Sequence, residues 1–250
     1  MDYPKFSIIT CSLDGSGLAD TVNSIVVSEF TNYEVIIVVK TRTHDVDNVL
    51  KELQGDSRFR MVSDDGSGIY SAMNLGSTVA IGDNLMFLNA GDKLKSMRSL
   101  SVLAHLAENA VWGYGDIEIV GAGKNSKRYS FRPYSKTLHR FGWKYVPHPA
   151  TFVSREVFES FGKFDLEYGV AADQHLLLRV AREFPPSLSS TVISIFSLGG
   201  QSTRKVKESM DDFHQVSLQV FGPLLNSSVI DSFAWNVNGK IKTLLKNFAR

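Results

Sequence analysis

Asp92 occupies a position from which a carboxylate could bind a cation or a substrate. It ends the sequence NAGD, which directly follows the apolar segment 84–88. Open α/β sheets bind their ligands beyond the carboxyl ends of buried strands. Mg²⁺ and Mn²⁺ prefer oxygen ligands, and one aspartate is sufficient when substrate phosphates complete the coordination shell. A turn aspartate that caps the following helix is the alternative interpretation.

Asp173 is a second candidate, in the sequence AADQHLLL at the predicted start of a helix. A carboxylate in the first turn of a helix interacts favourably with the helix dipole, which by itself explains the residue. A carboxylate that reaches a substrate hydroxyl could instead act as a general base. The hypothesis that Asp92 holds a metal while Asp173 takes a proton requires the two side chains to share one cleft.

Two further segments have groups suited to a bound ligand. His148 lies between two prolines, which would fix its imidazole either against a ligand or in a packed structural corner. The sequence GGQS at 199–202 follows a predicted strand, and it could offer backbone N–H groups to a phosphate or form an ordinary turn. Gly66, Gly68 and Gly76 match neither GxGxxG nor a Walker loop, which argues against a Rossmann dehydrogenase and a P-loop enzyme.

Composition sets broad limits on the class of protein. The 250 residues suffice for one large α/β domain, or for one domain with a small appendage. The net charge of +1 gives no reason to expect nucleic acid as a partner. Cys11, the single cysteine, is expected to be a core residue rather than a nucleophile, because no His–Asp pattern accompanies it. Residues 1–4 resemble no secretory signal and no run of about 18 apolar residues exists, which predicts a cytoplasmic protein.

Hydrophobic periodicity predicts the elements that must position these residues. Short apolar, β-branched runs alternate with segments of helical spacing through the first hundred residues. This alternation is typical of an α/β fold in which helices flank a Rossmann-like, mostly parallel sheet. The expected strands are 6–10, 33–39, 58–62 and 84–88, and the expected helices are 18–30, 45–53 and 69–80.

The pattern changes in the second half of the chain. Two longer strands, 111–120 and 127–131, flank a glycine-containing segment that predicts a hairpin turn over 121–125. Ser154 is a good N-cap for a helix that follows it. The other expected elements are the helices 96–106, 172–184, 206–221 and 230–248, and the strands 150–153 and 191–198.

The C-terminal segment 238–250 has a basic amphipathic pattern. It contains no acidic residue, and its apolar residues fall on one face of a helix. Such a helix could lie on an anionic membrane surface, or it could pack on the core as an ordinary terminal helix. The basic residues are Lys240, Lys242, Lys246 and Arg250, and the apolar residues are Ile241, Leu244, Leu245 and Phe248.

Together these motifs resemble the large family 2 of inverting glycosyltransferases, which have the A-type (GT-A) nucleotide-diphospho-sugar fold. Within that family the chain is most similar to bacterial transferases that build exopolysaccharide and O-antigen units, including the colanic-acid type. The resemblance covers about residues 6–204. The matching segments are GIYSAMNLG (68–76), LNAGD (88–92), HPATF (148–152), FD and AAD (164–173), and SLGGQS (197–202).

The resemblance implies a domain organisation and a role for each matching residue. It implies a catalytic domain over 1–204, with a nucleotide-binding half near 1–95 and an acceptor half near 96–204, followed by a helical extension over 205–250. Asp173 would be the catalytic base, and Asp92 would bind a divalent metal, Mg²⁺ or Mn²⁺. Residues near the acceptor and the diphosphate would be His148, Gly200 and Ser202. Residues that bind the nucleotide-sugar would be Thr10, Ser12, Lys40, Gly68, Tyr70, Asn74, Asn89 and Asp92.

Two positions depart from the pattern of this family. Gly91 stands where the common version of the DXD motif has its first carboxylate, so a metal would depend more on phosphate oxygens. Lys40 stands where the family usually has an aspartate that contacts the donor nucleoside. Because a cation cannot accept a hydrogen bond from the uracil N–H, a UDP-sugar donor does not follow from the resemblance.

The implied function is transfer of a sugar from a nucleotide-diphosphate donor to a saccharide acceptor with inversion, in synthesis of a bacterial surface polysaccharide such as lipopolysaccharide or exopolysaccharide. An acceptor carried on polyprenyl diphosphate would explain the basic terminal segment, and it would bring the protein to the inner face of the cell membrane. A catalytically silent nucleotide-sugar-binding protein is the alternative. A nucleotidyltransferase is disfavoured, because residues 11–17 contain no Lys or Arg.

Overall fold

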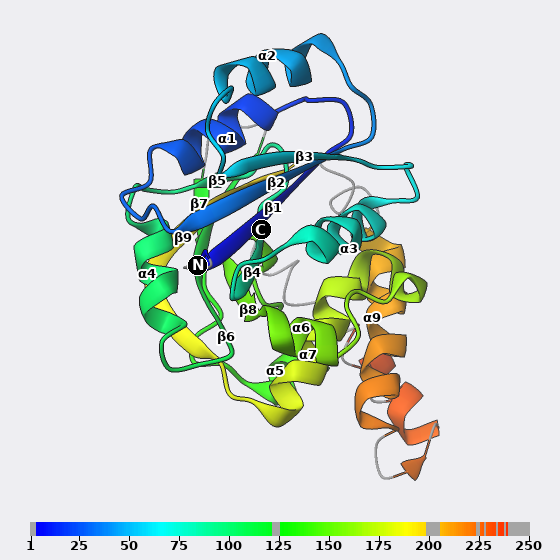
Figure 1. The fold of residues 1–250 in the computed structure, drawn as a ribbon. Helices are drawn as coiled ribbons and strands as arrows, with labels where there is room; N and C mark the ends of the chain where they lie inside the picture. The colour runs from blue at the N-terminus through cyan, green and yellow to red at the C-terminus, as the bar shows by residue number, and fades with distance from the viewer. Residues whose placement is uncertain are drawn as a thin grey trace.

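The computed structural model describes residues 4–121, 126–198, 206–223, 226–227, 229–233, 235–237 and 239. Within these residues one nine-stranded sheet has the order β3-β2-β1-β4-β8-β6-β9-β5, with β7 paired to β6 (Figure 1). The strands are β1 (Phe6–Ser12), β2 (Tyr33–Val39), β3 (Phe59–Ser63), β4 (Asn84–Phe87), β5 (Lys93–Leu94), β6 (Trp112–Val120), β7 (Ser126–Tyr129), β8 (Thr151–Ser154) and β9 (Ser187–Ser197). The helices are α1 (Leu18–Val26), α2 (His44–Glu52), α3 (Ile69–Val79), α4 (Ser99–Leu106), α5 (Lys136–Arg140), η1 (His148–Ala150), α6 (Arg155–Ser160), η2 (Leu166–Ala171), α7 (Ala172–Glu183) and α9 (Val206–Phe221).

Most strands of the sheet point in the same direction, as the sequence predicts. β1 pairs in parallel with β2 and β4, and β2 pairs in parallel with β3. β8 is antiparallel to both β4 and β6, so β6 runs with the first four strands, and β9 is parallel to β6. The carboxyl ends of β1, β2, β3, β4, β6 and β9 therefore lie at one edge of the sheet.

Helices cover both faces of the sheet, which explains the unbroken apolar runs of the central strands. Every residue of β1 and β2 is buried. One face packs Ile8 against α1, α2 and α4, and the other packs Ile9 against α3, α6 and α7. Cys11 belongs to the second core and burial raises the pKa of its thiol, so the predicted role as a packed core residue is confirmed.

The strand order reverses beside β1. The chain moves from β1 outward to β2 and β3, and then crosses back to add β4 on the other side of β1. Open α/β sheets bind ligands at such a reversal, outside the carboxyl ends of the strands. The loops that follow β1 and β4 are therefore placed to build a ligand site.

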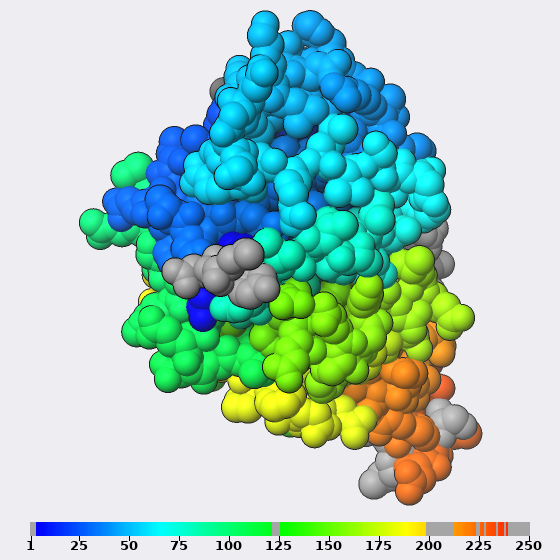
Figure 2. Space-filling view, in the orientation of Figure 1, coloured from blue at the N-terminus to red at the C-terminus, as the bar shows by residue number. Residues whose placement is uncertain are grey.

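Helix α9 packs against α7 and η2 at one end of the molecule. Phe213, Val216 and Val220 of α9 form a small core with Leu178 and Ala171. Figure 2 shows this helix in orange, beside the yellow-green region that contains α6 and α7. The bounds of α9 agree with those predicted from the sequence.

The structure differs from the sequence prediction at several element boundaries. α1 ends at Val26, yet Phe30 still packs on Phe6 from a loop, with 6.0 Å between ring centroids. The apolar periodicity therefore continues past the end of the helix and predicts it too long. β9 begins at Ser187 rather than at Thr191, because Ser187 and Leu188 already pair with β6. β5 and α5 were not predicted, since both are too short to produce a periodic pattern.

Several predicted segments lie wholly or partly outside the described residues. β6 and β7 pair antiparallel, as a hairpin requires, and residues 122–125 between them are among those not described. The predicted helix over 230–248 is helical at the described residues 230–233, 235–237 and 239. The GGQS sequence and the four basic residues of the C-terminal segment also lie outside the described residues.

Candidate functional site

The loops that follow β1 and β4 contact each other at the carboxyl edge of the sheet. The Ala90 N–H donates to the Cys11 carbonyl at 3.0 Å, and the Gly91 N–H donates to the Gly17 carbonyl at 3.3 Å. Gly17 has a φ of +73°, and a Cβ atom on it would lie 2.8 Å from the Gly91 Cα. Glycine is the residue that permits both this φ and this approach. The two loops are thus held together through their backbones.

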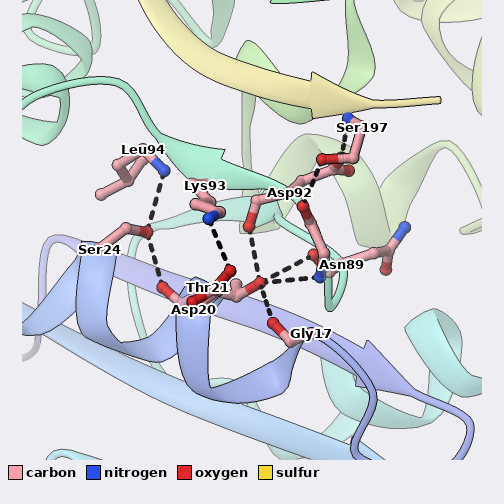
Figure 3. A network of polar contacts seen from close by, with 10 residues as sticks. Gly17, Asp20, Thr21, Ser24, Asn89, Asp92, Lys93, Leu94 and Ser197 are labelled. Atoms are coloured by element: carbon pink, nitrogen blue, oxygen red, sulfur yellow. Dashed lines mark hydrogen bonds and ion pairs between the residues drawn. The ribbon is translucent and has the colours of Figure 1, made fainter. Parts of the chain in front are cut away.

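Thr21 of α1 fixes the turn that carries Asp92 (Figure 3). Its hydroxyl donates to the Asp92 carbonyl at 2.6 Å and accepts from the Gly91 N–H at 3.0 Å. Further along α1, the Ser24 hydroxyl accepts from the Leu94 N–H at 3.0 Å. The backbone on both sides of Asp92 is therefore tied to α1, and the Asp92 carboxylate takes no part in these contacts.

The Asp92 carboxylate is itself buried, since the residue is 7% exposed. Its Oδ1 accepts a hydrogen bond at 3.0 Å from the N–H of Ser197, the last residue of β9. Burial raises the pKa of Asp92 to about 7, and the hydrogen bond from Ser197 opposes this increase. A cation bound to this carboxylate would offset the free energy that burial of its charge costs.

The turn contains two side chains, Asp92 and Asn89, whose oxygen atoms are of the type that a hard divalent cation binds. The Asn89 Oδ1 is buried without a hydrogen-bond partner among the described residues, and an amide oxygen is a type of ligand that Mg²⁺ and Mn²⁺ accept. No group of three or more His, Cys, Asp or Glu side chains that could hold a metal occurs in the described part of the chain. A cation would therefore depend on Asp92 as its carboxylate ligand and on oxygen atoms from a substrate.

Other residues predicted to bind the donor follow the same edge of the sheet. Thr10 of β1 is fully buried, and its hydroxyl has no partner among the described residues. The Ser12 hydroxyl accepts from the Gly15 N–H at 2.9 Å and so stabilises the turn after β1. The exposed Lys40 follows β2, and its side chain lies over Gly66, where any Cβ atom would collide with it. The absence of a side chain at Gly66 thus makes room for the lysine.

Asp173 lies in the first turn of α7 and is partly exposed. Both of its oxygens accept hydrogen bonds from Gln174: Oδ1 from the backbone N–H at 2.8 Å, and Oδ2 from the side-chain amide at 2.8 Å. Burial, and then the negative charge of Asp173, raise the pKa of Tyr70 well above its ordinary value. The start of α7 and the start of α3 are therefore close neighbours in the fold.

His148 lies between Asp173 and strand β4. Its imidazole stacks on Phe87 with 5.4 Å between ring centroids, and it meets Phe164 edge-on at 5.6 Å. Burial lowers the pKa of His148, and the charge of Asp173 opposes this shift. The imidazole is therefore neutral near pH 7. It occupies a packed corner, as one interpretation of its sequence position requires. Its contact with a ligand stays a prediction.

Helix α3 supports the segment that precedes α7. Asn74 accepts from the Phe164 N–H at 3.0 Å and donates to the Phe164 carbonyl at 2.8 Å. The Tyr70 hydroxyl donates to the Val170 carbonyl at 3.2 Å. Gly68 precedes the helix with a φ of 119°. The hydrogen bonds of Asn74 and Tyr70 go to the protein backbone, and their contact with a donor stays a prediction.

One electrostatic effect, one ring contact and one strand relate the two candidate carboxylates. The charge of Asp173 acts on His148, His148 stacks on Phe87, and Phe87 is the last residue of β4, shortly before Asp92. Both aspartates are therefore related to the carboxyl end of β4: Asp92 follows it in the sequence, and Asp173 acts on the histidine that stacks on its last residue. Gly200 and Ser202, which the sequence also places near the acceptor and the diphosphate, lie outside the described residues.

A groove of about 730 Å³ lies at the opposite edge of the sheet. Lys5, Asp83 and Arg155 line it, close to the amino ends of β1 and β4. Of the predicted donor, metal and acceptor residues that the structure describes, none lines this groove. We therefore assign the candidate site to the carboxyl edge.

Comparison with known protein families decides between the remaining classes of α/β protein. Residues 7–161 match the family described as Glycosyl transferase family 2. This chain belongs to that family. The match confirms the family resemblance inferred from the sequence, and it includes β1 to β4 with the loops that carry Asp92 and Lys40. Asp173 lies beyond the matched residues.

Relatives of this family 2 chain occur in mycobacteria. The chain is 29% identical over 211 residues to an uncharacterized glycosyltransferase of Mycobacterium tuberculosis, covering 81% of this chain and 78% of the relative. It is 27% identical over 188 residues to a PGL/p-HBAD biosynthesis glycosyltransferase of Mycobacterium bovis, covering 72% of this chain and 70% of the relative.

Solved structures of similar fold confirm the A-type architecture predicted for a family 2 chain. TarS of S. aureus (residues 1–349, in complex with UDP) superposes with a TM-score of 0.68 at 15% identity, covering 87% of this chain and 66% of that chain. The mannosyltransferase PcManGT of Pyrobaculum calidifontis, in complex with GDP-Man and Mn²⁺, gives a TM-score of 0.63 at 16% identity, covering 86% of this chain and 64% of that chain. This family 2 chain thus spans slightly less than two thirds of either structure.

The site also contains buried and partly buried polar residues that sequence analysis did not single out. Gln174, His139 and Tyr134 form a hydrogen-bonded series that ends on Asp173. His139 belongs to a five-residue helix that has no apolar periodicity. Gln174 is a buried residue of α7, and most other buried residues of that helix are apolar. No spacing in the sequence of this family 2 chain brings these residues together, so nothing short of the fold could identify them.

Proposed function

We propose that this family 2 chain is an enzyme that transfers a sugar from a nucleotide-diphosphate donor to a hydroxyl group of a saccharide acceptor, with inversion at the anomeric carbon. The observation that carries the proposal is the connection of two carboxylates through one strand. Asp92 follows β4, while Asp173 acts on His148, which stacks on Phe87 of the same strand. A donor-side and an acceptor-side carboxylate joined in this way suit a single displacement.

In this reaction Asp173 would accept the proton of the acceptor hydroxyl as its oxygen attacks the anomeric carbon. The bond between that carbon and the diphosphate oxygen would break in the same step, and its electron pair would leave with the nucleoside diphosphate. One displacement inverts the configuration at the carbon. A positioned general base typically contributes about 10²–10⁴-fold to the rate. The two hydrogen bonds from Gln174 would hold the Asp173 carboxylate for this step.

Asp92, with the Asn89 amide oxygen in the same turn, would hold a divalent cation, Mg²⁺ or Mn²⁺. When bound, the cation would supply charge neutralisation to the departing diphosphate. The raised pKa of Asp92, about 7, means that a proton competes with the cation for the carboxylate below neutral pH. Thr21 and Ser197 would keep the turn and the carboxylate in place. The Mn²⁺ present in the structure of PcManGT supports a divalent cofactor in a protein of this fold.

The donor would be a nucleotide sugar, the class of ligand present in two solved structures of similar fold. TarS was solved with UDP-GlcNAc, and PcManGT was solved with GDP-Man. In this chain Lys40 would approach the donor nucleoside from above Gly66. An ammonium group only donates hydrogen bonds, so it would favour a base edge or a phosphate that offers acceptors.

The acceptor would be a saccharide carried on polyprenyl diphosphate, used to build a bacterial surface polysaccharide at the inner face of the cell membrane. Val229 and Phe233 support membrane contact, because they are 76% and 70% exposed near the C-terminus. Lys240, Lys242, Lys246 and Arg250 follow in the sequence and would attract anionic headgroups. Among the described helices, none has both the length and the apolar character needed to cross a bilayer.

Release of nucleoside diphosphate from UDP-GlcNAc and from GDP-mannose, in Mn²⁺ and in EDTA, tests the proposed activity. Asp173→Asn is expected to retain donor affinity and to lose about 10²-fold or more in turnover, as removal of a general base requires. Wild-type turnover in this variant would refute the assigned base. The anomeric proton coupling of the transfer product, measured by NMR, distinguishes inversion from retention. Donor binding without any turnover in the wild type would instead favour the silent binding protein.

A further inference from the structure

We propose that Gln174 is a positioning residue for Asp173, and that a buried series of hydrogen bonds from Tyr134 through His139 sets the orientation of its side-chain amide. The proposal rests on the proposed function, in which Asp173 is the general base. It adds three residues, from two separate segments of the chain, that would act on the reaction without touching substrate.

The Gln174 side chain uses its full hydrogen-bonding capacity inside the protein. It is 6% exposed. Its Nε2 donates to the Asp173 Oδ2 at 2.8 Å and to the Val146 carbonyl at 3.1 Å. Its Oε1 accepts from the Val146 N–H at 3.0 Å and from the His139 Nε2 at 2.9 Å. Two donor hydrogens and two acceptor positions are all that a primary amide offers, so the group is fully satisfied.

Backbone groups fix which way this amide faces. The Val146 N–H can only donate and the Val146 carbonyl can only accept, so the two contacts with Val146 place Oε1 and Nε2 without reference to any titratable group. A flipped Gln174 amide would turn its oxygen toward the Asp173 carboxylate and its nitrogen toward the Val146 N–H. Both contacts would then be repulsive, and the flipped state is excluded.

The amide orientation also fixes the tautomer of His139. Because Oε1 of Gln174 accepts, the His139 Nε2 carries the proton, and Nδ1 accepts from the Tyr134 hydroxyl at 3.0 Å. His139 is fully buried, and burial lowers its pKa to about 3. Burial also raises the pKa of Tyr134. Near neutral pH the imidazole is therefore neutral and the phenol protonated, so the direction of every hydrogen bond in the series is constant.

The hydrogen-bonded series ends on the Asp173 carboxylate, which must be oriented toward the acceptor hydroxyl to act as a base. Gln174 donates to both oxygens of Asp173, through its backbone N–H to Oδ1 and through its side chain to Oδ2. These two bonds restrict rotation of the carboxylate and leave its remaining lone pairs for an acceptor hydroxyl. The same amide holds both backbone groups of Val146, two residues before His148. Gln174 thus sets the position of the base relative to the neighbouring His148 segment.

The titratable neighbours of Asp173 determine how a new charge at position 174 would affect its carboxylate. Tyr70 faces it from α3, His148 from η1, and Tyr145 from the segment before η1. None of these three carries a charge near pH 7, since burial favours the neutral form of each. A carboxylate introduced at Gln174 would therefore be the dominant new charge, within about 3 Å of Asp173.

The decisive comparison is between Gln174→Leu and Gln219→Leu. Gln219 of α9 is exposed and accepts from the Nε2 of His175, a residue of α7, at 2.8 Å. The control therefore also removes a His–Gln hydrogen bond, at a residue for which no contact with Asp173 is seen. We expect both variants to lose thermal stability. Only Gln174→Leu should lose kcat, by about 10–100-fold, which is part of the contribution of a general base. KM for the donor, measured by nucleoside diphosphate release from UDP-GlcNAc or GDP-mannose with Mn²⁺, should change less than about two-fold.

Gln174→Glu tests whether the residue at position 174 contacts the group whose ionisation limits the rate. It keeps the size of the side chain and places a second carboxylate beside Asp173, and two such groups share a proton. The acidic limb of the kcat profile should move up by at least about one pH unit. Tyr134→Phe should give a smaller loss of kcat, because it releases only the far end of the series.

The possible results separate this inference from the function on which it rests. Full turnover in Asp173→Asn removes the base assignment, and the role of Gln174 is lost with it. If Asp173→Asn is inactive while Gln174→Leu has the kcat of Gln219→Leu, the base stands and the positioning role is wrong. If Gln174→Leu does not fold, an unchanged pH profile in Gln174→Glu overturns the proposal, and a shifted profile supports it.

Discussion

Gly17→Ala tests whether the contact between the two site loops is a backbone contact. Gly17 has a φ of +73°, and an added Cβ would lie 2.8 Å from both the Cα and the N of Gly91. The methyl group cannot be accommodated by rotating a side chain, because backbone atoms oppose it. The β1–α1 loop would have to move away from the turn that carries Asp92.

The expected loss of stability is the sum of two effects. A left-handed conformation costs a non-glycine residue about 1 kcal/mol, and overpacking against a rigid neighbour costs about 1–3 kcal/mol. Gly17→Ala should therefore lose about 2–4 kcal/mol of unfolding free energy. In a chain of this size that corresponds to a decrease of roughly 4–16 °C in Tm. Displacement of Asp92 should also weaken the stabilisation that Mn²⁺ with UDP or GDP gives to the folded protein.

Gly55→Ala is the matched control, measured by urea and thermal unfolding under the same conditions. Gly55 has a φ of +93°, and a Cβ atom there would meet nothing within 4 Å. It should therefore show the conformational cost alone, about 1 kcal/mol. Equal losses in the two variants would refute the reasoning, because the clash with Gly91 would then contribute nothing. If Mn²⁺ with nucleotide stabilises Gly17→Ala as much as the wild type, the contact between the loops does not affect the metal site.

Three further predictions concern the metal, the donor and the membrane. Asp92 has its folded-state pKa raised to about 7 from an ordinary 3.8, so its ionisation should cost up to about 4 kcal/mol above pH 7 and nothing below pH 4. In EDTA, Asp92→Asn should thus be more stable than the wild type at pH 8 and equal at pH 4, and the same result at both pH values would contradict the burial argument. Lys40→Asp should increase affinity for UDP about ten-fold in calorimetry and leave GDP affinity without a similar gain, since a carboxylate accepts the uracil N–H; equal change for both nucleotides would count against base contact. Lys242→Glu with Lys246→Glu should reduce co-sedimentation with phosphatidylglycerol vesicles, and undiminished binding would remove the basic segment as the contact.

The sequence was most informative where burial on both faces left a strong pattern. β1 and β2 are apolar throughout because helices cover both sides, and their positions were predicted to within two residues at each end. Phe30 shows the limit of the same signal. Its spacing fits α1, but the residue packs on Phe6 from a loop, since burial and helical geometry are separate properties.

The candidate site could be predicted only where one residue and its position in an element carry the signal. Asp92 at a strand end and Asp173 at a helix start are visible in this way. The pairing of Gln174 with His139 is not visible, because it depends on how α5 and α7 pack. Asn74 marks an intermediate case, since its position near the site was predicted while its two hydrogen bonds to Phe164 were not.

The two carboxylates differ in what holds them, and the difference bears on whether the protein is an enzyme or a silent binder. The turn of Asp92 is held mainly by backbone groups of the sheet edge and by Thr21, so it persists as long as the fold does. The orientation of Asp173 depends on the side chain of Gln174, which one substitution could remove without altering the sheet. A protein that only bound nucleotide sugars would need the first arrangement, and it would need Gln174 only for the hydrogen bonds to Val146 that stabilise the fold. The presence of a fully satisfied, buried amide directed at Asp173 therefore favours an enzyme.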